Sequence, residues 1–123
     1  MDQHITDSAR ITGYHAHIYY DQATKATAAR VREGIGQRFT AIIGRWHDEA
    51  VGPHPISMYQ VAFDAAEFPR IVPWLMLNRE GLDILVHPLS GNGYLDHARF
   101  PLWLGTPVPL RLEILKRFEE QAA

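Results

Sequence analysis

The chain of 123 residues contains no cysteine, so it can form no disulfide and offers no thiolate to a metal. It has no apolar run close to the ~20 residues that a membrane-spanning helix needs. The formal net charge is −2, and lysine and arginine form no cluster, so the sequence predicts neither nucleic-acid binding nor membrane attachment. The N-terminal residues lack the basic and then apolar pattern of a signal peptide. We therefore expect a cytoplasmic protein whose metal ligands, if any, are nitrogen or oxygen atoms.

Two features of the composition bear on the fold and on the function. Apolar residues make up 46% and charged residues 21% of the chain, as in ordinary globular proteins, and the length predicts one domain over residues 1–123. Histidine is unusually frequent: seven occur, at positions 4, 15, 17, 47, 54, 87 and 97. This bias is the feature that a function has to explain.

The first third of the chain reads as a strand followed by a helix. Residues Tyr14 to Tyr20 alternate between two sides, which is typical of a half-buried strand rich in β-branched and aromatic residues. Asp21 is the expected N-cap of a helix that ends near Arg38. A second strand is expected from Thr40 to His47.

The remainder repeats this pattern. Ile56 to Phe63 reads as a strand, and Asp64 with Glu67 resembles a capping box that opens a helix. Prolines at 69 and 73 should kink or split that helix, and the glycine at 81 should cap it in the left-handed conformation. We then expect a strand over residues 82–86, a Gly-rich loop over 87–97, and a final helix from residue 109 through 118.

The resulting order is β-α-β-β-α-β with a C-terminal helix. This is the α+β pattern of ferredoxin-like folds, in which an antiparallel sheet carries two helices on one face. The first strand is then central, and the fourth strand lies antiparallel beside it. The helices should cover the side that carries Tyr14, Ala16 and Ile18.

This topology gathers histidines on the opposite face of the sheet. His15 and His17 lie two residues apart and share a side, and Tyr19 follows on the same side. His87, near the end of the fourth strand, should lie close to His15. A His-x-His pair with a third imidazole from the neighbouring strand is a workable facial set of metal ligands. His97 can fold back over this face, whereas we expect His54 near the rim or in a partner subunit's site.

Histidines in strands more often satisfy hydrogen bonds or face solvent than bind metal, so two further interpretations stay open. One is a ferredoxin-like module that binds a metal or small ligand without turnover, since this scaffold hosts many functions. The other is a dimeric interaction protein whose histidines fill buried polar positions. A homodimer is expected in each case, because the second face of a four-stranded sheet would otherwise expose a large apolar patch.

Several fragments, in order and at compatible spacing, resemble one known family. These are "YHAHIYYD", "GPHP", "WLMLNREGLDILVHPLSG", "DH" and "WLGTPVPL", which run from about residue 14 to 110. Together they resemble the DOPA dioxygenase-like family of aromatic ring-opening enzymes. The resemblance implies a dimeric ferredoxin-like protein that uses non-haem Fe(II) and O₂ to cleave a catechol beside its hydroxyls. The family's motif histidines correspond to His15, His17, His54, His87 and His97.

Extradiol cleavage needs a metal with open positions for two catecholate oxygens and O₂, which three ligands on one side allow. The resemblance therefore implies ligand roles for His15, His17 and His87. It leaves His54 or His97 to accept and return the second catechol proton, and Tyr19 to stack on or hydrogen-bond the ring. Many such enzymes use a carboxylate as the third ligand, so Asp96 is either a ligand or the residue that orients an imidazole. Zinc in place of iron would leave the fold similar and the chemistry absent.

Overall fold

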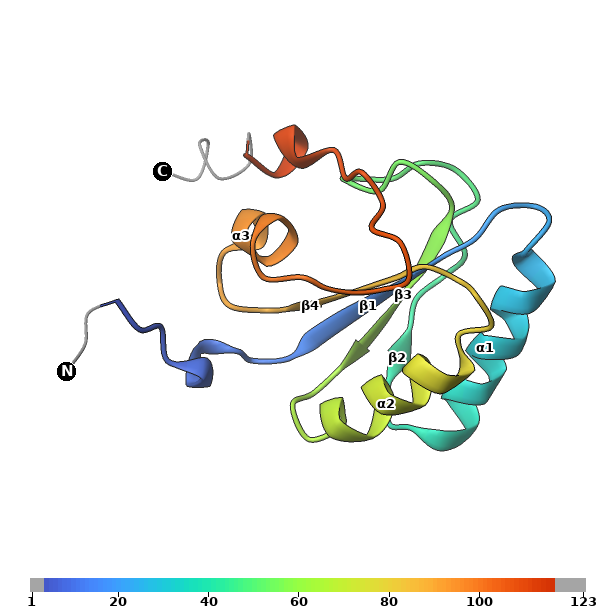
Figure 1. The fold of residues 1–123 in the computed structure, drawn as a ribbon, viewed down its shortest axis with the longest axis horizontal. Helices are drawn as coiled ribbons and strands as arrows, with labels where there is room; N and C mark the ends of the chain where they lie inside the picture. The colour runs from blue at the N-terminus through green and yellow to red at the C-terminus, as the bar shows by residue number, and fades with distance from the viewer. Residues whose placement is uncertain (1–3, 117–123) are drawn as a thin grey trace.

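The computed structural model describes residues 4–116 (Figure 1). The elements in chain order are η1 (Ser8–Arg10), β1 (Tyr14–Tyr19), α1 (Lys25–Arg38), β2 (Ile42–Ile43), β3 (Met58–Phe63), α2 (Phe68–Asn78), β4 (Ile84–Pro88), α3 (Gly93–Ala98) and β5 (Leu102–Leu104). The strands form one antiparallel sheet in the order β2-β3-β1-β4-β5. The first six strands and helices confirm the ferredoxin-like α+β topology, with β1 in the centre and β4 beside it.

Helices α1 and α2 lie side by side on one face of the sheet, and α3 lies on the other (Figure 1). The main core fills the space between the sheet and α1 and α2. From β1 it takes Ala16 and Ile18, and from the helices it takes Val31, Ile35 and Leu75. The period-two pattern of β1 and the helical spacing of the apolar residues explain this layer fully.

The residues that begin α1 differ from the prediction. The helix starts at Lys25 with Thr24 as its N-cap, and Thr24 makes no side-chain cap bond. Asp21 instead lies three residues earlier, where its carboxylate accepts hydrogen bonds from the Thr24 N–H and hydroxyl at 2.9 Å each. Asp21 thus stabilises the turn before the helix, as Asp does when its side chain bonds the backbone a few residues on.

The predicted strand from Thr40 to His47 is mostly irregular. Regular pairing is confined to β2 (Ile42–Ile43), and His47 rejoins the sheet as an isolated bridge to Met58. As the edge strand, β2 has a neighbour on one side, which leaves few hydrogen bonds to keep a longer strand regular.

Helix α2 is continuous, so the expected split is wrong. Pro69 lies in the first turn, where its missing N–H costs nothing. Pro73 lies inside the helix, and the buried side chains of Ile71, Val72 and Leu75 hold the helix on the sheet around it. The predicted capping box is wrong, because the helix begins at Phe68 with Glu67 as its N-cap. The Asp64 carboxylate accepts from the Glu67 N–H at 3.1 Å in the turn before the helix. Gly81 has φ +83°, confirming the left-handed position after the helix.

The largest departure lies after β4, where a loop was expected over residues 87–97. Residues Gly93–Ala98 form α3, because the Asn92 side chain caps it by accepting from the Leu95 N–H at 3.0 Å. Strand β5 (Leu102–Leu104) then pairs with β4 and extends the sheet to five strands. Of the predicted C-terminal helix, residues 112–116 are helical, and Phe118 lies outside the described residues.

A second, smaller core lies on the α3 side of the sheet. It contains Tyr19, Met58, Leu85 and Val108, with Val51, Trp103 and Leu110 packed against it. The chain therefore covers much of the face that was expected to need a partner subunit. Among the described residues, no helix is both long and apolar enough to cross a bilayer.

Candidate metal centre

The register of the central strands places three candidate residues on one face. His15 lies directly opposite His87 in the antiparallel pair of β1 and β4, and His17 lies opposite Leu85. Residues opposite one another in such a pair share a face, and Tyr19 follows by the period of two. The predicted placement of His15, His17 and His87 together, on the face away from α1 and α2, is confirmed.

His54 and His97 join them from outside the central strands. His54 ends a tight turn in which Val51 and His54 exchange backbone hydrogen bonds of 2.9 and 3.1 Å. Its ring centroid lies 4.1 Å from that of His17, and the His97 ring of α3 lies 4.1 Å from that of His87. The expected rim position of His54 is wrong, because its side chain is only 4% exposed. The turn folds His54 inward over β1.

These five imidazoles offer two sets of donors that could hold a metal ion. One set is His15, His17 and His87, and the other is His17, His54 and His97; within each, the ligand atoms lie within 4.8 Å of one another. Across residues 4–116, both metal-capable sets consist of histidine alone. His17 belongs to both and therefore lies at the centre of the cluster.

Asp96 bonds Ser90 and belongs to neither of the two donor sets. Its buried carboxylate accepts hydrogen bonds from the Ser90 hydroxyl at 2.5 Å and from the Ser90 N–H at 3.2 and 3.3 Å. These bonds tie α3 to the segment that follows β4, and so fix His97, the next residue along the helix. Asp96 acts on the site by positioning α3.

Backbone carbonyls determine the tautomers of two of the imidazoles. His87 Nδ1 lies 2.9 Å from the Pro88 carbonyl oxygen, and His97 Nδ1 lies 2.7 Å from that of Gly93. A carbonyl can only accept, so each Nδ1 carries the hydrogen and each Nε2 keeps a lone pair. Both rings therefore present Nε2 in the form that a metal or a proton requires.

Burial lowers the pKa of four of the imidazoles, those of His15, His17, His54 and His87. It lowers the pKa of His87 to about 3 and that of His54 to about 4, and the other imidazoles nearby add to both effects. The pKa of His17 lies well below its ordinary value for the same reasons, and the pKa of His15 is lowered mainly by burial. Neutral imidazole is the form that binds metals.

Two contacts test whether this donor set suits a metal. His17 Nε2 lies 3.1 Å from His87 Nε2, so two ring nitrogens point at one another across the two strands. His17 Nδ1 is buried without a hydrogen-bond partner among the described residues, which is uncommon for a polar atom in a folded protein. A cation bound by nitrogen ligands suits converging imidazoles that lack other partners. The residues present fit a metal ion.

One neighbour of the cluster, Trp103, was not predicted from the sequence. The ring of Trp103 stacks on Tyr19, with centroids 6.2 Å apart, and Tyr19 in turn bonds His54 through its hydroxyl, which lies 2.7 Å from Nδ1. Trp103 lies on β5, a strand that the sequence did not predict. An aromatic residue that pairs with a strand of the site, as Trp103 does across from Leu85, is the signal that a prediction of β5 would have supplied.

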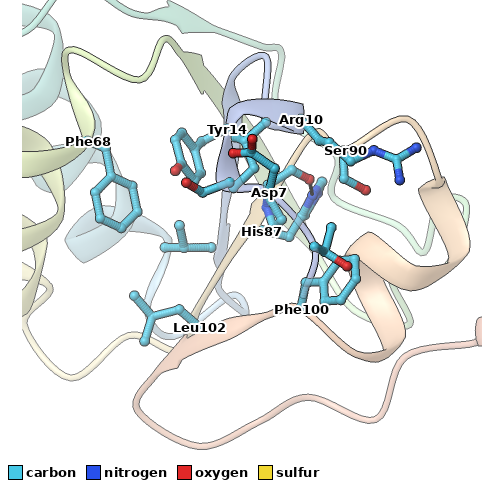
Figure 2. A pocket seen from close by; sticks show the side chains of 13 residues that line it. Asp7, Arg10, Tyr14, Phe68, His87, Ser90, Phe100 and Leu102 are labelled. Atoms are coloured by element: carbon cyan, nitrogen blue, oxygen red, sulfur yellow. Dashed lines mark hydrogen bonds between the residues drawn. The ribbon is translucent and has the colours of Figure 1, made fainter. Parts of the chain in front are cut away.

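An apolar cavity of about 370 Å³ lies beside the cluster, at the edge of the sheet. Figure 2 shows Tyr14, Phe68, Phe100 and Leu102 around it, with Asp7 of the N-terminal segment close by. Of the five clustered imidazoles, His87 alone is among the residues that line it. The cavity therefore borders the cluster without enclosing it, and its lining does not form a metal site.

Comparisons with known proteins relate the chain to dioxygenases. The Dopa 4,5-dioxygenase family matches over residues 14–114. A crystal structure of a protein from Nostoc punctiforme PCC 73102, described as a candidate dioxygenase, superposes with a TM-score of 0.92 at 54% identity, covering 93% of this chain and 99% of that one.

Two fungal relatives match less closely. An uncharacterised 21.2 kDa protein of Botryotinia fuckeliana is 36% identical over 95% of this chain and 70% of its own length. A DOPA 4,5-dioxygenase of Amanita muscaria is 32% identical over 89% of this chain. The match spans about half, 52%, of the Amanita protein.

Proposed function

The chain belongs to the Dopa 4,5-dioxygenase family, and on that premise we propose that it is an extradiol dioxygenase, which opens the ring of a catechol with non-haem Fe(II) and O₂. Membership makes the protein a dioxygenase-type enzyme, for which oxygen and an aromatic compound are the general substrates. The proposal adds the catechol, the position of cleavage and the metal.

The observation that carries the proposal is the cluster of five imidazoles around His17. We assign the metal to His15, His17 and His87, because two of them share β1 and the third lies directly across from His15. Three ligands from one face of a sheet leave the opposite side of the ion open. When bound there, Fe(II) would supply the redox chemistry and the Lewis acidity that ring cleavage needs.

The residues around the ligands then bind the substrate and move its protons. We assign proton transfer to His54 and His97, because their rings lie next to the proposed ligands. The ring centroid of His54 lies 4.1 Å from that of His17, and the ring centroid of His97 lies 4.1 Å from that of His87. Tyr19 is assigned to the site through its bond to His54. The second histidine set, His17 with His54 and His97, is the alternative ligand assignment.

A homodimer and a cytoplasmic location stay predictions. The apolar face of the sheet supports a dimer less than the sequence suggested, because the chain itself covers Tyr19, Met58 and Leu85. Exposed apolar side chains remain elsewhere, including Ile42 on β2 and Leu77 on α2, and a symmetric pair is the common way to cover such residues.

The test is anaerobic reconstitution with Fe(II), followed by metal analysis and a scan of catechols in an oxygen electrode. We expect one equivalent of iron per chain, oxygen uptake with at least one catechol, and a yellow ring-opened product. Zinc-loaded protein should bind its metal and consume no oxygen. His4→Ala, which changes an exposed histidine far from the cluster in sequence, is the control for His17→Ala. Iron binding without oxygen uptake on any catechol would instead favour the non-catalytic metal-binding module.

A further inference from the structure

We propose that Gln60 is a substrate-binding residue of the histidine cluster. The ring of the catechol lies over β3, on the side of the cluster that faces β2, and the carboxamide of Gln60 donates a hydrogen bond to one of its hydroxyl oxygens. Gly44, the neighbour of Gln60, leaves the space that a substituent on the ring needs. This assignment rests on the proposed function for the class of substrate, but its main test measures binding and needs no turnover.

Gln60 is the neighbour of the central histidine on β3. It lies directly opposite His17 in the antiparallel pair of β1 and β3, so the two side chains share a face and their Cβ atoms are about 5 Å apart. The other side chains that β3 directs to this face are those of Met58 and Ala62, which are apolar. Gln60 is therefore the hydrogen-bonding group that β3 places beside the proposed ligands.

The fold itself makes no use of the Gln60 carboxamide. The side chain forms no hydrogen bond with any of residues 4–116, and the residue is half-buried. A carboxamide can donate two hydrogen bonds and accept two. The chain thus holds a donor and an acceptor next to His17, both of which are available to a bound molecule.

The face that carries the histidines is closed over β4 and open over β3. On β4, Leu85 and His87 are 0% and 1% exposed, because α3 lies against β4 (Figure 1) and the second core covers the rest of that strand. On β3, Gln60 and Ala62 are only half-buried. Ile42 of β2, which lies opposite Ala62, is 77% exposed. A flat molecule can therefore reach the histidines over β3.

Gly44 lies beside Gln60 on the edge of this open side. Its N–H donates to the Gln60 carbonyl oxygen at 2.7 Å, and a Cβ added to it would lie 3.7 Å from the Gln60 Cβ. A longer side chain at this position would therefore occupy the space next to the carboxamide. Glycine leaves that space empty, and Ile42 offers an apolar contact at its outer end. A substituent on the substrate ring fits between them.

A neutral donor suits the position beside His17. The carboxamide does not exchange protons with the substrate, so it holds a hydroxyl oxygen by a hydrogen bond and leaves proton transfer to other groups. A polar group at a fixed place within an apolar surface is what orients a small ligand in a binding site. Since this contact exists before and during the reaction, it should lower KM and change kcat little.

The first test measures the affinity for a catechol without turnover. Zinc-loaded protein is titrated with 4-nitrocatechol, whose absorption changes when its hydroxyl groups ionise. Gln60→Met, which nearly keeps the shape of the side chain, and Gln60→Leu should both raise Kd by about 3–10-fold, the size of one net hydrogen bond. Gln37→Leu is the matched control, because the Gln37 amide bonds Glu33 on α1, across the sheet. Zinc content and melting temperature should be equal in all four proteins.

The second test measures the space beside Gln60. Catechol and 4-tert-butylcatechol are each allowed to compete with 4-nitrocatechol for the zinc-loaded protein. Gly44→Leu should weaken the binding of 4-tert-butylcatechol roughly tenfold more than that of catechol, because the new side chain and the substituent need the same space. Gly44→Ala is the control, since its Cβ would make only ordinary contacts of 3.4 Å or more, and it should change both affinities little. In iron-loaded protein, Gln60→Leu should raise KM and leave kcat nearly unchanged.

Each outcome decides a separate question. Unchanged affinity of both Gln60 variants for 4-nitrocatechol would overturn the role of Gln60, even in an active dioxygenase. Loss of zinc from either variant would also overturn it, by making Gln60 part of the metal site. Equal effects of Gly44→Leu on the two competitors would overturn the placement of the substituent. If wild-type protein binds no 4-nitrocatechol, this assignment and the proposed function both fail. Binding that depends on Gln60, without oxygen uptake by iron-loaded protein, would refute the proposed function alone.

Discussion

Gly34 offers a quantitative test of how the layer of helices is packed. It lies in α1, and a Cβ added there would lie 2.7 and 2.9 Å from the Cη2 and Cζ2 atoms of Trp74 on α2. The indole has little freedom to move, because the Phe39 ring lies 5.8 Å from it and the Arg38 guanidinium 5.6 Å. Gly34 therefore allows the two helices to approach.

The expected effect of Gly34→Ala is the difference between two terms. Alanine favours a helix over glycine by about 1 kcal/mol. Inserting a methyl group into an occupied contact costs about 1–3 kcal/mol, and the distances to Trp74 are far below ordinary contact, which favours the upper part of that range. The net loss is about 1–2 kcal/mol in the free energy of unfolding, or about 4–8 °C in melting temperature for a domain of this size.

Gly36 is the matched control, since a Cβ there would meet only Ile43 Cδ1 at 3.7 Å. Gly36→Ala should gain up to about 1 kcal/mol. Thermal melts followed by circular dichroism measure both changes, and metal analysis should show equal metal content, because α1 lies on the face opposite the histidines. If Gly34→Ala raised the melting temperature as much as Gly36→Ala, the tight contact with Trp74 would be refuted.

Four further predictions follow from the site. His17→Ala should lose its metal by atomic absorption while His54→Ala keeps it; equal loss from both would favour the alternative ligand set. The free energy of unfolding of the metal-free protein should fall as the pH drops below about 6.5. The pKa values of His17, His54 and His87 are lowered in the folded state, so these rings take up protons only after unfolding. Urea titrations that show higher stability at lower pH would contradict this. Ser90→Ala should lower the free energy of unfolding by about 1–3 kcal/mol, because the buried Asp96 carboxylate loses the hydrogen bond from the Ser90 hydroxyl. An unchanged urea midpoint would refute this. Sedimentation at micromolar concentration should give the mass of two chains, and the mass of one would rule out the dimer.

The histidine face was predictable because it depends on local pattern and one topological rule. Alternation along β1 fixes the side of His15 and His17, and the ferredoxin-like order makes β4 the neighbour of β1. The register then brings His87 opposite His15. None of these steps needs the details of side-chain packing.

The residues around His15, His17 and His87 were less predictable, because several of them lie on short elements. Helix α3 has six residues, begins with a glycine and lies among turn-forming residues, so its sequence resembles a loop. Strand β5 has three residues, too few for alternation to be recognised. His54 could not be placed because its turn follows an irregular segment, and only the packing against Tyr19 and His17 shows that it folds inward.

The most direct test of the central claim is the fate of molecular oxygen. Iron-loaded protein should be mixed with a turned-over catechol under ¹⁸O₂, and the product analysed by mass spectrometry. Ring cleavage by a dioxygenase predicts a ring-opened product with one ¹⁸O in its new carboxylate and a second ¹⁸O in its aldehyde when the aldehyde is reduced at the quench, before its oxygen exchanges with water. Wild-type protein and His4→Ala should form this product, and His17→Ala should not. A product that carries no labelled oxygen, or equal product from His17→Ala, would contradict the assignment of dioxygenase chemistry to the histidine cluster.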